Sequence, residues 1–195
     1  MSRIPAETLN EGRRRVFSPD RQAFGAIVEE HQVAVYNLCY RMLGDPRLAE
    51  DAAQEAFLRA FRSLKRFDPA RSIRTWLLSI AAHHCIDILR RHARLARLPL
   101  GDRPLVEPGA GPEAALLQSE TEGEVRRLLT RLNPEERAAI VLRYWYDLSH
   151  EEIAEVTKST LDTVRTRLYR ARRRLAAAAS SGGQPEGRRN EARAV

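Results

Sequence analysis

Six arginines fall within ten residues near the C-terminal end of the sequence, and their type and crowding indicate phosphate binding. They occupy the stretch "RTRLYRARRR" at positions 165–174. A guanidinium group makes paired hydrogen bonds to phosphate oxygens and to guanine edges. A polyanion would neutralise the mutual repulsion of these side chains, so the pattern predicts a nucleic-acid partner. The alternative is the solvated basic face of an ordinary helical bundle.

Charge is distributed unevenly around this stretch. Residues 113–157 include five basic and ten acidic residues, whereas residues 158–175 include seven basic residues and one acidic residue. The whole chain has a formal net charge of +7 and a pI of about 10.1, which suits a polyanionic partner. Nearly all its basic residues are arginines, and a GC-rich genome explains most of that excess. The local reversal of charge is therefore more informative than the net charge.

Two short helical patterns with a polar break between them position the arginines. Ser149 and Glu152 form a capping box that begins the first helix, and Ser159 with Asp162 predicts where the second begins. The apolar face of the second helix consists of Leu161, Val164, Leu168, Ala171 and Leu175. The opposite face consists of Thr163, Arg165, Thr166, Arg167, Arg170, Arg173 and Arg174. This arrangement predicts a helix-turn-helix whose second helix enters the major groove. For residues 172–174, an interaction with the dipole at the end of the helix is an equal alternative.

A second group of residues with reactive side chains comprises His83, His84, Cys85 and Asp87. Successive helical residues diverge by about 100°, so these neighbours cannot all converge on one ion. His83 and Asp87 share a face, but two ligands are too few for a metal site. The sequence also contains no phosphate loop and no nucleophile–base pair, so we expect neither catalysis nor a metal nor a cofactor.

The two cysteines, Cys39 and Cys85, lie inside apolar helical patterns. Two buried thiols in a reducing compartment are expected, because a disulfide framework or a zinc site needs more cysteines. No apolar run approaches the ~18 residues of a membrane span, and the N-terminus lacks a signal-peptide core. These features predict a cytoplasmic protein without membrane insertion.

Helical spacing of apolar residues dominates the chain and predicts an all-α fold of two small helical domains. Within the first domain, Gly44, Asp45 and Pro46 mark the end of one helix and the start of the next. Within the second domain, Asn133 and Pro134 mark another helix start.

Composition indicates the domain boundaries. Residues 99–112 contain four prolines and three glycines without helical periodicity, which is typical of a linker. We expect a flexible N-terminus, a first domain, a linker, a second domain with the helix-turn-helix, and a disordered tail, at residues 1–17, 18–97, 98–112, 113–179 and 180–195.

Two blocks of the sequence resemble regions of bacterial sigma-70-type factors. The block "LNPEERAAIVLRYWYDLSHEEIAEVTKSTLDTVRTRLYRARRRL" is similar to their promoter −35-binding region. The segments "DAAQEAFLRAFRSLKRF" and "RTWLLSIAAHHCIDILRR" resemble their core-binding and −10-binding region. The two blocks occur in the right order, with a linker between them and no extra regions, as in the extracytoplasmic-function (ECF) subgroup. The resemblance covers residues 18–179 and implies a sigma factor that directs promoter-specific transcription initiation.

The resemblance also implies where core RNA polymerase binds. The helix of residues 51–64 would contact the clamp coiled coil of the largest subunit, and the flap is a further implied contact. The implied core-binding residues are Asp51, Gln54, Glu55, Phe57, Arg59 and Leu64. For Asp51 and Glu55, a solvated face near the positive helix start is the alternative.

The third helix and the turn before it would read the −10 element. The implied contacts are Arg71, Arg74, Trp76, His83, Arg90 and Arg91. The turn "FDPARS" would hold a base flipped out of the stack. Core packing is favoured over base stacking for Trp76, and it is also expected for Phe61 and Phe67. Many relatives have asparagine at the position of His83.

The second helix of the helix-turn-helix would read the −35 element. The implied contacts are Ser159, Thr160, Thr163, Arg165, Thr166, Arg167 and Arg170. Asp162 replaces a small residue, often glycine, of the family pattern. Its carboxylate would repel a nearby phosphate, but it can cap the helix or accept from a cytosine amino group.

The linker lets one monomer hold two unlike promoter elements. A linker of about 15 residues spans at most ~50 Å, which is roughly 15 base pairs before the width of the domains is added. The family also implies an anti-sigma factor as an inhibitory partner. The alternative function is a helix-turn-helix regulator that does not replace sigma, although the core-binding block of the first domain argues against it.

Overall fold

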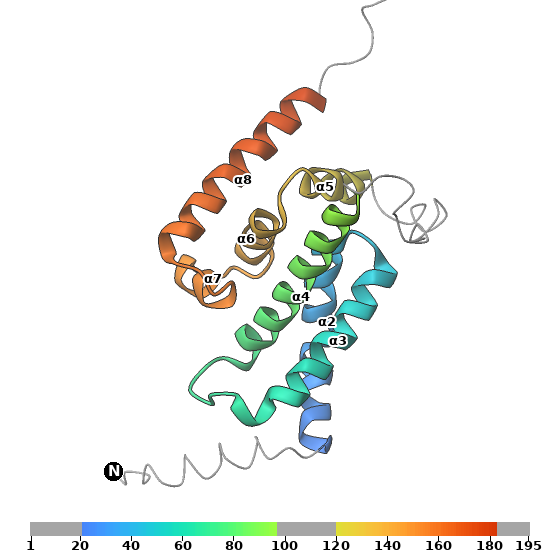
Figure 1. Ribbon diagram of the computed structural model, residues 1–195, viewed down its shortest axis with the longest axis vertical. Coiled ribbons are helices and arrows are strands. Elements are labelled where there is room, and N and C mark those ends of the chain that lie inside the picture. Colours follow the sequence, from blue (N-terminus) through green and yellow to red (C-terminus); the bar gives the residue numbers. More distant parts are fainter. Residues whose placement is uncertain (1–20, 97–119, 183–195) are drawn as a thin grey trace, which may run out of the picture.

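The computed structural model describes residues 21–96 and 120–182, which are built from helices and turns (Figure 1). The first unit consists of α2 (Arg21–Leu43), α3 (Pro46–Ser63), η1 (Leu64–Arg66) and α4 (Ile73–Leu95). The second unit consists of α5 (Glu120–Thr130), α6 (Pro134–Trp145), α7 (His150–Val156) and α8 (Leu161–Gly182). The all-α prediction is confirmed. The expected N-terminal segment and linker lie outside the described residues, and α8 extends to Gly182, inside the expected tail.

Side-chain caps begin several of these helices where the sequence predicts them. Oδ1 of Asp45 accepts a hydrogen bond from the amide of Leu48 at 2.9 Å, and Pro46 follows it as the first residue of α3. Gly44 has φ of +75°, a left-handed conformation that lets the chain turn sharply between α2 and α3. A capping box of Asn133 and Glu136 begins α6. These caps fix the lengths and directions of the helices that bear the candidate sites.

Close packing of α3 defines the first unit. The buried face of α3 consists of Ala49, Ala52, Ala53, Ala56 and Ala60. Such small side chains let α3 approach α2 and α4, whose larger residues fill the space between the helices. Those residues include Val35, Leu38, Met42, Leu77 and Leu78. The result is a three-helix bundle with α3 on its outer side (Figure 1).

The second unit is organised around α6. Its residues 138–142 are buried on nearly every side, because α6 lies between α8 and the first unit. Ile153 and Val156 of α7 and the apolar face of α8 complete this core. On that face Val164, Leu168 and Ala171 are buried. The apolar face that the sequence predicts for the second helix of the helix-turn-helix is therefore confirmed.

The two units pack directly against each other, with α6 and α7 against α2 and α4. The hydroxyl of Tyr146 donates to the carbonyl of Ala34, and Nη1 of Arg137 donates to the carbonyl of Met42 at 2.6 Å. Burial raises the pKa of the Tyr146 phenol, so it remains a donor. The guanidinium of Arg41 lies 4.4 Å from the ring centre of Trp145. The closed arrangement therefore combines polar contacts with an apolar core that continues from one unit into the other.

Cys39 and Cys85 are free and buried in the first unit, as predicted. A hydrogen bond to the neighbouring Cys39 thiol, followed by burial, raises the pKa of the Cys85 thiol, which disfavours a reactive thiolate. Across the two described ranges, every helix is too short or too polar to cross a bilayer.

Candidate nucleic-acid interface

The turn between α7 and α8 presents the helix-turn-helix. The predicted start of α8 is displaced by one residue, because Thr160 rather than Ser159 caps it. Oγ1 of Thr160 accepts from the amide of Thr163, whereas the hydroxyl of Ser159 pairs with that of Thr157 at 2.8 Å. Lys158 has φ of +47°, so a left-handed residue follows the C-cap of α7 and lies in the turn between the two helices.

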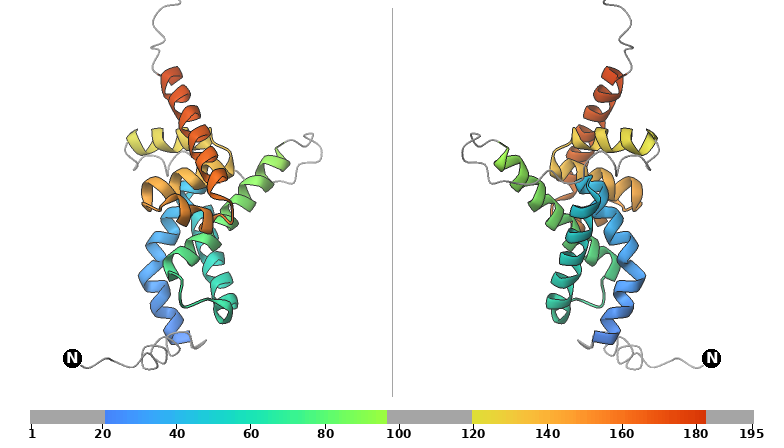
Figure 2. Two further views of the ribbon diagram at one scale, coloured as in Figure 1. Left: turned by 90° about the vertical axis from the view of Figure 1, so that its left-hand side faces the viewer. Right: turned by 90° about the vertical axis from the view of Figure 1, so that its right-hand side faces the viewer.

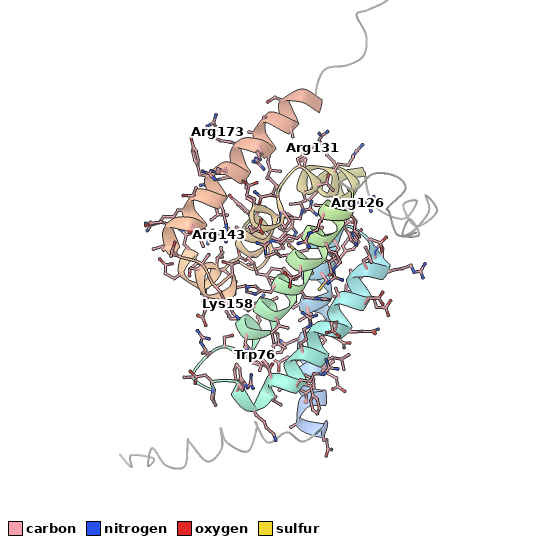
Figure 3. All side chains as sticks on the ribbon, viewed as in Figure 1. Trp76, Arg126, Arg131, Arg143, Lys158 and Arg173 are labelled. Carbon is pink, nitrogen blue, oxygen red and sulfur yellow. The ribbon has the colours of Figure 1, made fainter. Side chains whose placement is uncertain are left out.

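The outermost face of α8 consists of Asp162, Thr166, Tyr169, Arg170 and Arg173, all of which are exposed. Tyr169 is 56% exposed, and the guanidinium of Arg173 lies 5.9 Å from its ring centre. Arg173 points away from the bundle (Figure 3). An exposed aromatic ring among arginines suits stacking and contact with base methyl groups. We did not predict Tyr169, although it lies three residues after Thr166 on the same helical face.

Arg174 has an internal anionic partner. Its Nη1 lies 2.9 Å from Oε2 of Glu136, a carboxylate that is only 2% exposed and that also closes the capping box of α6. Arg174 is therefore partly neutralised by the protein. The alternative of a C-terminal dipole interaction for residues 172–174 is wrong, because α8 continues to Gly182 and the dipole acts only within the last turn.

Three of the arginines predicted to read the −10 element contact the second unit. Arg71 pairs with Glu155 of α7 at 2.9 Å, and Nη2 of Arg90 lies 2.6 Å from Oε1 of Glu135. The guanidinium of Arg74 lies 5.6 Å from the ring centre of Tyr146, the residue that directly follows α6.

A groove of about 510 Å³ lies where α4, α6 and α8 meet. Arg90 of α4 and Glu135 of α6 line it together with the predicted −35 residues Thr163, Thr166, Arg167 and Arg170. The structure thus brings side chains from both predicted DNA-reading sets into one groove, whose lining combines the arginines Arg90, Arg167 and Arg170 with the carboxylates Glu135, Glu136 and Asp162.

The other predicted −10 residues differ in their surroundings. Trp76, near the start of α4 (Figure 3), packs on Phe67 with ring centres 4.8 Å apart, and core packing is confirmed for both residues. Nδ1 of His83 donates to the carbonyl of Ser79 at 2.7 Å, so that ring is held against its own helix. Arg91 is exposed near the C-terminal end of α4.

The outer face of α3 carries an exposed row of polar and apolar side chains. Asp51 and Gln54 are exposed as predicted, and they continue into Leu58 and Phe61, which are 51% and 36% exposed. We did not predict Leu58. The core packing expected for Phe61 is confirmed only in part, because its ring contacts that of Phe24 but remains 36% exposed. Spacing alone identifies the row, because residues 51, 54, 58 and 61 share one helical face.

The remaining predicted core-binding residues lie beside or beneath this row. Glu55 accepts a hydrogen bond from Arg59 at 2.7 Å, which lowers the pKa of the Glu55 carboxyl. Phe57 is half-buried against the core, and Leu64 is 2% exposed. Leu64 was therefore wrongly placed on the partner-facing surface: it follows Ala60 by four residues in helical conformation and continues the buried face of α3.

The described ranges contain no group of three or more histidine, cysteine or acidic side chains that could hold a metal ion. His84 borders Glu55 and Arg59 of α3, and burial, followed by the charge of Arg59, lowers the pKa of its imidazole. The uncharged ring therefore adds no positive charge to this surface near neutral pH.

Comparison with known proteins identifies the family. The sequence matches the model of sigma-70 region 2 over residues 27–95 and that of sigma-70 region 4 over residues 122–175. It is 36% identical to the ECF RNA polymerase sigma factor SigW of Bacillus subtilis, over 83% of this chain and 91% of SigW.

The chain is an ECF sigma factor of the sigma-70 family.

Two solved structures have a similar arrangement of helices. One is the structure of CnrH in complex with the cytosolic domain of CnrY. CnrH is 28% identical to this sigma factor, with a TM-score of 0.62 over 87% of this chain and 95% of CnrH. The other is RpoE of Bartonella quintana in complex with the anti-sigma factor NepR, with 21% identity and a TM-score of 0.65 over 80% of this chain and 96% of RpoE. The second likeness concerns the fold alone.

The family assignment places the candidate surfaces in defined regions of this sigma factor. The row on α3 and the arginines of α4 belong to region 2, whereas the outer face of α8 belongs to region 4. The contacts of Arg71, Arg74 and Arg90 with α6 and α7 are therefore contacts between the two regions.

The pairing of Arg174 with Glu136 leads to a stability prediction. We expect Arg174→Ala to lower the free energy of unfolding by about 1–3 kcal/mol, because it leaves a buried carboxylate without its cation. Urea unfolding followed by circular dichroism measures this change as a lower midpoint with an unchanged slope. Arg173→Ala removes a charge from the exposed face and serves as the control, with a change within about 0.5 kcal/mol. Equal effects of the two substitutions would contradict the assignment.

Proposed function

We propose that this sigma factor binds core RNA polymerase through the outer face of α3 and reads two promoter elements with α4 and α8. The observation that carries the proposal is the presence of both sigma regions in order in one chain, each with its own exposed surface. Domain limits close to residues 18–97 and 113–179, joined by the segment 98–112, are part of the proposal. The chain acts as a non-enzymatic initiation factor in the cytoplasm, where polymerase and template are found.

The α3 surface suits a protein partner. Asp51 and Gln54 offer acceptors for an arginine-rich surface such as the clamp coiled coil of the largest subunit. Leu58 and Phe61 add apolar area beside them, and exposed side chains of this kind mark interaction sites when they lie together. Glu55, Arg59 and the half-buried Phe57 border this contact. A further contact with the polymerase flap rests on the family resemblance.

The outer face of α8 suits the major groove at the −35 element. Thr160 and Thr163 lie at the N-terminal end of α8, the part of a recognition helix that reaches base edges. Arg165, Thr166 and Arg170 follow on the exposed side, with Tyr169 between them. Arg167 lies at the edge of this face, and Ser159 belongs to the turn that precedes it.

The start of α4 and the turn before it suit a melted −10 element. Arg71 lies in the turn "FDPARS", and Arg74 lies in the first turn of α4. Arg90 and Arg91 lie more than four helical turns further along, which suits a second contact on the backbone of the DNA. His83 lies between these two pairs of arginines along the chain. Trp76 supports this surface from the core rather than by stacking on a base.

An anti-sigma factor is also part of the proposed function. An inhibitory protein would cover the α3 face or the arginines of α4, because both must be free for initiation. CnrH, at 28% identity, was solved with the cytosolic domain of CnrY. This supports a protein partner for the present chain as well.

In vitro transcription with sigma-free core polymerase tests the proposal. Addition of this chain to core polymerase on fragmented genomic DNA should produce transcripts with defined starts, and mapping those starts should reveal a common −35 and −10 element. Core polymerase alone and the chain alone serve as controls. A DNA-binding regulator that does not replace sigma would give no specific starts, and that result would overturn the proposal.

The α3 surface leads to a prediction about polymerase affinity. We expect Gln54→Ala to weaken binding to core polymerase by about fivefold or more, because interface residues that matter cost more than ~1 kcal/mol when truncated. The loss should lower transcription from every promoter alike. Titration of core polymerase with a fluorescent derivative measures it. Gln32→Ala, an exposed glutamine on α2, is the matched control and should have wild-type affinity. A promoter-dependent effect would contradict the assignment.

The α8 surface leads to a prediction about the upstream element. We expect Arg165→Ala to lower affinity for a −35 duplex by about 5- to 100-fold, which corresponds to the ~1–3 kcal/mol of one specific arginine contact. Binding to core polymerase should be unchanged. Arg131→Ala removes an equal charge from the turn before α6 and is the control, with nearly wild-type DNA binding. The same loss for both variants would indicate a general charge effect instead.

A further inference from the structure

A single acidic residue, Asp162, interrupts the basic and polar outer face of α8. Its side chain is 90% exposed and lies in the first turn, the part of a recognition helix that reaches base edges. α8 lies beside α7 at this end and extends past α5 at the other, as both side views show (Figure 2). A carboxylate therefore occupies the part of α8 that is proposed to approach DNA most closely.

The carboxylate of Asp162 takes no part in the cap of α8. Oγ1 of Thr160 accepts from the amide of Thr163 at 3.2 Å, and the two threonine hydroxyls pair at 2.8 Å. Asp162 instead lies next to Arg165, with Oδ1 3.4 Å from Nη1. An ionised carboxylate has about four acceptor sites, so this one contact leaves others for an external donor. An acidic residue in the first turn also interacts with the helix dipole, but salt screens that effect at an exposed position.

Asp162 and Arg165 together match the major-groove edge of a C·G base pair. On that edge the N4 amino group of cytosine donates, whereas O6 and N7 of guanine accept. N4 and O6 share a Watson–Crick hydrogen bond, so they are about 2.9 Å apart. The two side chains present the complementary order, an acceptor and a donor 3.4 Å apart. One carboxylate and one guanidinium side by side therefore suit a single base pair.

Other bases fit the carboxylate less well. Thymine and guanine present only acceptors in the major groove, and these repel a carboxylate. Adenine offers its N6 amino group, but the N7 acceptor lies beside that donor. DNA phosphates also repel Asp162, so its charge lowers affinity for DNA of any sequence. Asp162 therefore contributes discrimination between bases rather than general affinity.

We propose that Asp162 and Arg165 together read one C·G base pair of the −35 element. The Asp162 carboxylate accepts from N4 of cytosine, and the Arg165 guanidinium donates to O6 and N7 of guanine in the same pair. Glycine, which is frequent at this position in the family, has no side-chain acceptor, so this selectivity is a property of the present chain. The inference rests on the proposed contact of α8 with the −35 element.

Transcription by core polymerase with the full chain tests the inference on promoters that differ at one −35 base pair at a time. We expect the wild-type protein to prefer C·G at one position by about fivefold or more, the lower limit for one specific base contact. Asp162→Ala should reduce that preference to about twofold or less and leave the preferences at the other positions unchanged. Arg165→Ala should lose discrimination at the same position, because both side chains read one pair.

An isosteric substitution gives a sharper test. Asp162→Asn keeps the shape of the side chain, but an amide pairs with N6 and N7 of adenine. This variant should therefore shift the preference at the same position from C·G toward A·T. Glu151→Gln removes an equal charge from an exposed site on α7 and is the matched control, with every base preference unchanged. Circular dichroism verifies that all variants are folded.

Three outcomes would contradict these expectations in different ways. An unchanged preference in both Asp162→Ala and Asp162→Asn would overturn the inference and leave Asp162 only its interaction with the helix dipole. Loss of discrimination by Arg165→Ala at a different base pair would overturn the joint reading of one pair. A wild-type protein without any base preference in the −35 element would instead overturn the proposed function of α8, so the two failures are distinguishable.

Discussion

The contact of α6 with α2 holds the two regions of this sigma factor together. Its polar contacts are made by side chains of α6 that donate to main-chain carbonyls of α2, near the end of α2 at Met42 and further back at Ala34. A carbonyl in the last turn of a helix has no partner within the helix, so Arg137 satisfies an acceptor that would otherwise require water. Burial lowers the pKa of the Arg137 guanidinium without neutralising it, which adds a desolvation cost to closure. The closed state therefore combines favourable packing with a buried charge, a combination that limits its net stability.

Two arginines of region 2 have anionic partners within the protein. A guanidinium binds a carboxylate or a phosphate, and here Arg71 and Arg90 pair with Glu155 and Glu135 of region 4. Phosphate adds the free energy of counterion release, which a single carboxylate does not provide. Both arginine side chains are more than half exposed, so the two ion pairs are screened by salt and each adds little to stability.

The crowding of arginines on α8 is relieved partly within the protein. Arg174 turns toward buried Glu136, and Nε of Arg172 donates to the carbonyl of Leu168. Arg173, by contrast, lies on the outermost face beside Tyr169. Glu136 links the start of α6 to the middle of α8, so one carboxylate fixes both the cap of one helix and the position of the recognition helix. The remaining positive charge is concentrated on the side of α8 that suits DNA.

Much of the fold could be read from the sequence because its determinants are local. Caps at Asp45, Asn133 and Ser149 join residues three positions apart, and the apolar faces repeat every three or four residues. The start of α8 was displaced because two neighbouring hydroxyl residues can each cap it, and the structure uses Thr160 while Ser159 pairs with Thr157. Leu64 was misplaced on the partner surface although helical spacing puts it on the buried face, four residues after Ala60.

Only part of the candidate site could be predicted from the sequence. The exposed helical face with residues 51, 54, 58 and 61 follows from periodicity, and the six arginines are evident from composition. The sequence by itself determined the helices, their apolar faces and the two regions of the family. Only the tertiary structure decided that Arg71, Arg74 and Arg90 contact region 4. The hydrogen bonds that accompany these contacts join residues 77 to 112 positions apart, and no local periodicity encodes a contact between two helices that meet only in space.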